Sequence, residues 1–265
     1  MSDARHDPPS CPSLVFVGTG EALDPELPNT SLLVHGSQKT ILLDCGYAVP
    51  HAFWRRSRDV DLLDAIWISH VHADHVFGLP ALLLWMRLGG RTRALTLIGG
   101  PGSRARLEQV LELGYPGSYA PSKCYPIEFI ELSPGELGQL GEFDLSVAAS
   151  AHSIANHALR LDAPGLRSLV YSGDGAITDA TRELCRGVSV LVHECFFVSP
   201  HGRKHGDVDS CLELAHTFGV ETLALLHFAS ESKQAIREHA RARVSKNLEL
   251  LLPAPGERLI LQTSD

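Results

Sequence analysis

The sequence has no apolar run long enough to cross a membrane. A spanning helix needs about 18 or more consecutive apolar residues, and no segment of this 265-residue chain approaches that length. The first residues, MSDARHDPPSCPS, are polar and rich in proline, without the apolar stretch of a secretion signal. We therefore expect a cytoplasmic protein without a membrane partner.

The sequence also lacks closely spaced cysteine pairs. Its six cysteines include no C-x-x-C motif, which excludes a zinc ribbon and a disulfide framework. We expect six reduced thiols, several of them buried as small hydrophobic groups. They are Cys11, Cys45, Cys124, Cys185, Cys195 and Cys211.

Positive charge is scarce. The formal net charge is −8, so the average surface repels nucleic acid. Four arginines do lie close together in the sequence, and we expect them to be scattered and solvated. They are Arg91, Arg93, Arg104 and Arg106.

Short apolar runs alternate with amphipathic stretches along the whole chain, and 44% of the residues are hydrophobic, enough for a substantial core. Strands are predicted at 13–18, 30–36, 40–46, 65–70, 94–99, 125–132, 143–150, 157–163, 168–174, 188–195, 221–228 and 257–262. Helices are predicted at 79–88, 103–114, 179–187, 207–219 and 232–244. This pattern predicts an α/β (α+β) fold of two mixed β-sheets with helices packed outside. We expect one domain over residues 13–265, after a flexible lead of residues 1–12.

Histidine is abundant, with 14 residues. Several of these (His6, His51 and His239) lie in polar contexts and need no special role. The stretch SHVHADHVFGLP at 69–80 is different, because it packs an H-x-H-x-D-H motif directly behind a predicted buried strand. Such crowded ionisable groups need a compensating partner, and a metal ion supplies one.

One ion cannot take all four groups of this motif. Adjacent Asp74 and His75 point differently from His70 and His72, so the pattern favours two ions. Each ion needs further ligands, and the ends of later predicted strands offer candidates, with either His152 or His157 available from the segment HSIANH. The other two candidates are Asp174 and His227.

The chain resembles the metallo-β-lactamase superfamily and, within it, the ribonuclease Z-like phosphodiesterases. The resemblance covers nearly the whole sequence and rests on VFVGTGEALDP, LLDCGYAVPH, SHVHADHVFGLP, YSGDG, LVHECFF and LLHFAS. It implies the αββα sandwich of that superfamily, in which two sheets lie face to face between helices.

The resemblance also implies roles for individual residues. His152 is preferred over His157 because it directly follows a strand and precedes Ser153. Asp174 stands where the β-lactamases proper have a cysteine, which makes a β-lactamase activity unexpected. Five histidines and two carboxylates favour zinc, although manganese or iron would fit the same groups. By resemblance, the ligands of the first metal are His70, His72 and His152. The ligands of the second metal are Asp74, His75 and His227. Asp174 would bind both metals.

The implied reaction is attack on phosphorus by a hydroxide that bridges the two metals. Asp74 would orient that hydroxide or accept its proton. LVHECFF and RKHGDVDS stand where the ribonuclease Z family has its His-Glu-Ala-Thr and His-Ser-Thr boxes, so Glu194 and His205 would form a proton-donor pair. For Glu194 the alternative is that it only orients a metal-bound histidine. His193 is expected to point into the core.

Three departures from the family concern the substrate. Only 21 residues separate His152 from Asp174, too few for the arm with which ribonuclease Z enzymes clamp tRNA. The Arg-Tyr pair that follows the last histidine ligand in the family is absent after His227, and the His-Ser-Thr box reads His-Gly-Asp in this chain. We therefore predict a hydrolase of small or cyclic phosphodiesters.

Two other activities remain open at this point. The first alternative is a ribonuclease Z-like endonuclease acting on RNA or tRNA 3′ ends, with a homodimer supplying the missing contacts. The second is a thioester or lactone hydrolase, which His205 disfavours because a proton donor suits a poor alkoxide leaving group.

Overall fold

The computed structural model describes residues 11–202 and 204–263. His6 and most of the predicted flexible lead lie outside these residues. At the end of that lead, the carbonyl of Pro12 accepts a hydrogen bond of 3.0 Å from the backbone N–H of Leu261.

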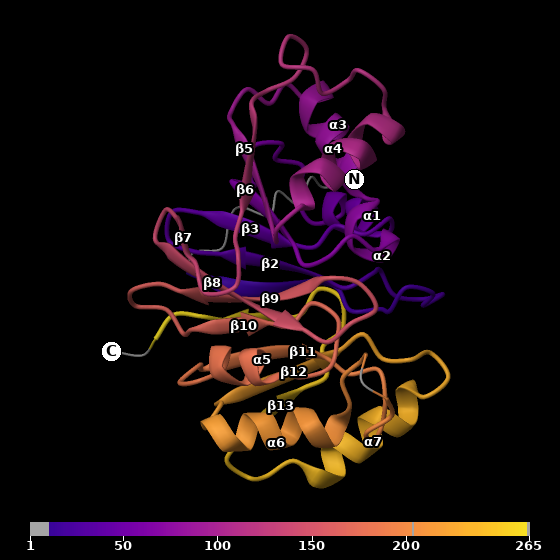
Figure 1. Cartoon of the computed structure of the whole chain (residues 1–265), viewed down its shortest axis with the longest axis vertical. Helices are drawn as coiled ribbons and strands as arrows, with labels where there is room; N and C mark the ends of the chain where they lie inside the picture. Colours follow the sequence, from indigo (N-terminus) through magenta and orange to yellow (C-terminus); the bar gives the residue numbers. More distant parts are fainter. Residues whose placement is uncertain (1–10, 203, 264–265) are drawn as a thin grey trace, which may run out of the picture.

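The described chain forms two seven-stranded sheets, and each combines a parallel with an antiparallel part (Figure 1). The first has the order β14-β1-β2-β3-β4-β5-β6 and is parallel from β3 to β6. The second has the order β13-β12-β11-β10-β9-β8-β7 and is parallel from β10 to β13. The first sheet comprises β1 (Ser13–Gly18), β2 (Ser31–His35), β3 (Thr40–Leu43), β4 (Ala65–Ile68), β5 (Leu95–Gly99), β6 (Ile127–Glu131) and β14 (Arg258–Ile260). The second comprises β7 (Leu137–Leu140), β8 (Phe143–Ser150), β9 (Asn156–Asp162), β10 (Leu169–Tyr171), β11 (Val190–Glu194), β12 (Thr222–Leu226) and β13 (Glu249–Leu251).

Helices cover the outer face of each sheet, at opposite ends of the view in Figure 1. The first sheet is covered by α1 (Val49–Trp54), α2 (Ala73–Val76), α3 (Leu79–Leu88) and α4 (Ser103–Gly114). The second is covered by α5 (Asp179–Leu184), α6 (Val208–Phe218) and α7 (Lys233–Arg243). A central core that includes Trp67 and Tyr171 fills the space between the two sheets. The predicted αββα sandwich is confirmed. No helix in the described ranges is both long and apolar enough to cross a membrane.

Four short elements were not predicted from the sequence: α1, α2, β7 and β13. The helices α1 and α2 have six and four residues, too few for a helical apolar period to be recognised. The strands β7 and β13 lie at the two edges of the second sheet. β7 forms a tight hairpin with the next strand, β8, whereas β13 pairs with β12, more than 20 residues earlier in the chain. Pairing, and not their own composition, makes both segments strands.

The sequence analysis is wrong about Arg91, although the other three arginines of that group are exposed. Arg91 is buried, and its guanidinium donates hydrogen bonds of 2.7–2.9 Å to the carbonyls of Val60, Leu63, Arg93 and Ala94. These bonds join the loop before β4 to the loop before β5, so this arginine stabilises the fold.

The fold gathers the predicted site residues at one edge of the sandwich. His70 follows β4, His152 follows β8, Asp174 follows β10 and His227 follows β12. Sites in open α/β sheets form outside the carboxyl ends of parallel strands, because loops from neighbouring strands converge there. Three of these four strands belong to parallel stretches of the two sheets.

Away from that edge, the imidazole of His35 in β2 is buried, and its Nδ1 lies 3.3 Å from Thr40 Oγ1. Burial and the charge of Arg258 lower the pKa of His35 to about 4. The folded state therefore favours the neutral ring, whereas the unfolded chain takes up a proton near pH 6.5.

We predict that His35 makes the fold sensitive to acid. Its contribution is complete above about pH 6.5 and is lost as the pH falls toward 4, which costs up to about 3 kcal/mol. Urea unfolding of wild type and His35→Gln across this range measures it. The variant should lose less stability on acidification, and parallel pH curves for the two proteins would contradict the prediction.

Candidate metal centre

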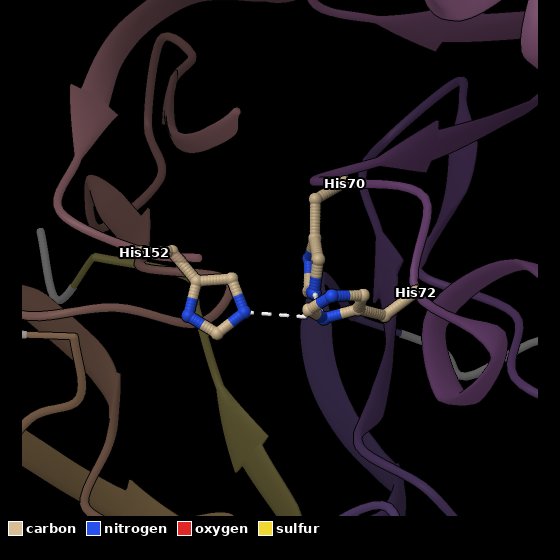
Figure 2. Close-up of side chains that lie close together, drawn as sticks. All are labelled: His70, His72 and His152. Carbon is tan, nitrogen blue, oxygen red and sulfur yellow. Dashed lines mark hydrogen bonds between the residues drawn. The ribbon is translucent and has the colours of Figure 1, made fainter. Parts of the chain in front are cut away.

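Three histidines direct ring nitrogens toward one point (Figure 2). Nδ1 of His72 lies 3.0 Å from Nε2 of His70 and 3.1 Å from Nε2 of His152. His70 and His72 come from the loop between β4 and α2, whereas His152 comes from the loop after β8 in the other sheet. Each half of the sandwich therefore contributes to the group.

These rings favour the neutral form. Burial and the neighbouring histidines, chiefly His75, lower the pKa of His70. The pKa of His72 is also lowered, by partial burial and by His152. A neutral imidazole has a free lone pair on one nitrogen, and this is the form that binds metal ions.

A second group contains two carboxylates and two further histidines, with one ligand atom from each within 4.8 Å of the others. Oδ1 of Asp174 lies 3.4 Å from Nε2 of His75 and 3.3 Å from Nδ1 of His227, while its Oδ2 lies 3.9 Å from Nε2 of His70. Asp174 thus faces both groups. The second group consists of Asp74, His75, Asp174 and His227.

Two buried atoms of this group lack a hydrogen-bond partner among the described residues. They are His75 Nε2 and Asp174 Oδ1, which lie 3.4 Å apart but are not hydrogen-bonded to each other. Buried polar atoms are otherwise almost always paired, so a cation between them would satisfy both. Burial alone would raise the pKa of the Asp174 carboxyl, but His227 and His75 hold it well below its usual value. The carboxylate therefore stays ionised, as a metal ligand must.

Asp44, to which the sequence analysis gave no role, orients His75. Its fully buried carboxylate accepts hydrogen bonds from the Ser69 backbone N–H and hydroxyl, both at 2.7 Å, and from the Tyr171 hydroxyl at 2.6 Å. His75 Nδ1 lies 2.8 Å away, so Nε2 is the nitrogen that faces the second group. Asp44 itself has the left-handed φ of 58° that non-glycine residues seldom adopt.

Asn156, also missed from the sequence, holds the loop of Asp174. Its Nδ2 donates to the carbonyls of Asp174 and Ser172, and its Oδ1 accepts a 3.3 Å hydrogen bond from the Asp174 N–H. Gly173 and Gly175 flank the aspartate with φ of 59° and 117°. A Cβ on Gly173 would lie 2.6 Å from Asn156 Oδ1, so only glycine allows this approach.

The carboxylate of Glu194 is buried behind this loop and holds His205. One oxygen lies 3.0 Å from His205 Nδ1 and accepts from the backbone N–H groups of Gly175 and Gly206, at 2.8 and 3.0 Å. The other accepts from the Phe196 N–H at 3.0 Å. Its only imidazole partner among the described residues is therefore His205, outside both predicted ligand sets.

His205 lies at the centre itself, since one of its ring nitrogens is within 4.8 Å of ligand atoms of His152 and Asp174. Its ring is partly exposed. Burial lowers its pKa, but the hydrogen bond and charge of Glu194 outweigh this, and the net shift is upward. A protonated, solvent-accessible ring beside the two groups can donate a proton.

The two remaining candidate histidines are buried outside the centre. His157 packs against Gly100, where an added Cβ would lie 2.2 Å from its Nδ1. His152 and not His157 lies with His70 and His72. His193 is buried with Nδ1 2.6 Å from the Glu194 carbonyl oxygen, as expected for a side chain that points into the core.

We predict that Asp44→Asn weakens metal binding more at the second group than at the first. The amide cannot replace the charge that orients His75, and loss of such a partner typically lowers metal affinity about 10–100-fold. Asp44 reaches the first group only indirectly, through the Ser69 hydroxyl, which lies 3.0 Å from His70 Nδ1. Metal titration by calorimetry should show one strongly weakened step and one smaller change. Tyr171→Phe removes a different donor to Asp44 and serves as the control, and equal weakening of both steps would contradict the role of Asp44.

Comparisons with known proteins identify the fold and the family of this chain. Ribonuclease BN from Erwinia tasmaniensis is 27% identical, over 82% of this chain and 89% of its own length. The metallo-β-lactamase fold protein YhfI from Bacillus subtilis superposes with a TM-score of 0.78 at 19% identity, over 94% of this chain and 98% of that chain. The short form of human tRNase Z superposes with a TM-score of 0.74 at 19% identity, over 95% of this chain and 100% of that chain.

These structures confirm the metallo-β-lactamase fold that the sequence motifs indicated. The family is established by sequence, because the model of the anti-Pycsar protein Apyc1 matches residues 12–250, far more than half of the chain. The protein therefore belongs to the Apyc1 family of anti-Pycsar proteins.

Proposed function

We propose that this protein is a metal-dependent phosphodiesterase that hydrolyses small cyclic phosphodiesters, with cyclic nucleotides as the substrate class. The observation that carries the proposal is the pair of ligand groups that share Asp174 beside a histidine held by Glu194. The family supports it, because anti-Pycsar proteins degrade cyclic nucleotides.

The residues present fit two divalent ions, and nitrogen-rich ligands favour zinc over manganese or iron. The unpaired buried atoms of His75 and Asp174 are the positions at which cations are most needed. When bound, two ions would neutralise charge on the phosphate and lower the pKa of an attacking water. His70, His72 and His152 would hold one, Asp74, His75 and His227 the other, and Asp174 both.

Asp74 is the group placed to receive the proton of the attacking water. Its carboxylate lies 3.2 Å from His75 Nε2. Burial opposes its ionisation, but the adjacent His75 imidazole lowers its pKa overall. The ionised carboxylate can therefore accept a hydrogen bond from the water and orient its attack on phosphorus.

His205 would protonate the leaving oxygen as its bond to phosphorus breaks. Because Glu194 engages Nδ1, the proton available for donation is on Nε2. The upward shift of its pKa favours the protonated ring. The neutral ring can then regain a proton from solvent, since a quarter of its side chain is accessible. Glu194 acts through His205 and is a positioning residue in this scheme.

The short connection between His152 and Asp174 supports a small substrate. Its strands, β9 and β10, pair as an antiparallel hairpin through residues 163–168, without room for a tRNA-clamping arm. Processing of RNA 3′ ends is the second candidate, favoured by the similarity to ribonuclease BN. In that case a homodimer would supply further RNA contacts.

We also propose that the protein acts in the cytoplasm. All six cysteines are free, and four of them are buried. Reduced thiols are typical of proteins in a reducing compartment.

The metal proposal predicts close to two divalent ions per chain, measured by mass spectrometry after purification. Asp174→Ala should lose most of both, because its carboxylate faces both groups. His239→Ala removes a histidine outside the centre and should keep them. A single tightly bound ion in fully active wild-type protein would refute the two-ion model.

The proposed proton donor is tested with the His205→Ala variant. It should retain its metals, but its turnover of a substrate with a poor leaving group should fall roughly 10²–10⁴-fold. Bis(p-nitrophenyl) phosphate needs no protonated leaving group, so its turnover should fall much less. The decline of wild-type rate at high pH should also disappear in the variant. Equal losses on both substrates would assign His205 another role.

For the substrate, kcat/KM on a 3′,5′-cyclic nucleotide should greatly exceed that on precursor tRNA at physiological salt and equal metal loading. Phosphate contacts supply most of tRNA affinity, and this chain has a net charge of −8. A preference for precursor tRNA by orders of magnitude would favour the RNA-processing alternative.

A further inference from the structure

A pocket of about 650 Å³ lies outside the metal centre, between the loop after β1 and the C-terminal end of α1. None of the seven candidate metal ligands lines it. Its walls include the side chains of His51, Arg55 and Arg56 together with Leu27, Pro28 and Pro255. We propose that this pocket binds a small phosphate-bearing ligand of mononucleotide size, independently of the metals.

The charge of the pocket is the first argument. Neither Arg55 nor Arg56 forms a hydrogen bond or ion pair through its side chain with the described residues, and Arg56 Nε is buried without a partner. Burial and the like charge of Arg55 lower the pKa of Arg56. The buried, unpaired Nε of Arg56 beside a second guanidinium group favours an anion at this position, and phosphate is the anion whose geometry guanidinium groups match.

The acidic residues of the pocket do not neutralise these arginines. Asp24 is engaged by Lys233, with its Oδ2 2.7 Å from Nζ. Glu26, which is exposed, is then the one carboxylate of the lining left to balance the charge of two guanidinium groups. A positive pocket on a chain with a net charge of −8 is a local feature that an anionic ligand would find by electrostatic attraction.

The shape is the second argument. Small-molecule sites typically measure about 300–1,000 Å³ and combine apolar walls with a few polar groups. Here Val17, Leu27, Ala52 and Pro255 add apolar groups to a lining that also contains the two arginines. Arg56 lies against the backbone at Gly256, where an added Cβ would be 3.0 Å from its Nη2. Its guanidinium therefore lies against the backbone at the pocket wall.

Asn29 connects the pocket lining to the backbone beside Asp74. Its side chain accepts a 2.9 Å hydrogen bond from the N–H of Ala48, which lines the pocket, and it packs near Gly46, whose backbone lies against that of Asp74. None of the candidate metal ligands lines the pocket, so binding there can be measured without the metals.

The test uses the full chain depleted of metal with a chelator, titrated by calorimetry with uridine 5′-monophosphate and, separately, with inorganic phosphate. Wild type should bind one mononucleotide per chain. The double variant Arg55→Gln/Arg56→Gln should bind it roughly tenfold more weakly or worse, because charged hydrogen bonds are lost. Arg58→Gln is the matched control, since Arg58 is exposed, close in sequence and not part of the wall.

Absence of binding by metal-depleted wild type would overturn the proposal, as would equal weakening in the Arg58 variant. If inorganic phosphate bound as tightly as uridine 5′-monophosphate, the proposal that the ligand is of mononucleotide size would be wrong. If the double variant does not fold, Arg55→Gln alone gives the same comparison, because Arg55 is exposed. The binding is measured without metals, so its failure is distinguishable from failure of the proposed phosphodiesterase activity.

Discussion

The buried carboxylate of Asp174 is the group on which the whole centre depends. A buried negative charge is costly unless cationic partners compensate it, and Asp174 faces histidines of both ligand groups. The surrounding structure holds it there through the Asn156 side chain and two glycines with positive φ. Such an arrangement is costly without cations and favourable with them, which explains why the centre needs so much local support.

The sandwich makes this arrangement possible. One ligand segment follows β4 of the first sheet, and the others follow β8, β10 and β12 of the second. The central core holds the two sheets in register, so loops that are distant in sequence meet at one edge. A site shared between two rigid halves is positioned more accurately than one built on a single mobile loop.

Support outside the ligands follows the same principle. Asp44 fixes which nitrogen of His75 faces the centre, and Glu194 does the same for His205. Each carboxylate is fully buried and binds further donors besides its histidine: one backbone N–H and two hydroxyls at Asp44, and three backbone N–H groups at Glu194. These bonds hold the carboxylate in place before it orients the imidazole. Orientation of this kind is what metal-binding and proton-donating histidines require.

The sequence by itself determined the layered fold and the identity of the clustered residues. Strand and helix periods are local properties, and the H-x-H-x-D-H motif brings four groups together within six residues. The short connection between His152 and Asp174 was likewise visible in the sequence, and it forms the expected hairpin.

Only the tertiary structure decided the features that depend on contacts between distant segments. It selected His152 over His157, buried Arg91 against four carbonyls, and revealed Asp44 and Asn156 as supports of the centre. It also formed the edge strand β13, which pairs with β12, and the arginine pocket. A single sequence pattern does not encode these features, because each is a pairing or packing contact that exists only once the chain has folded.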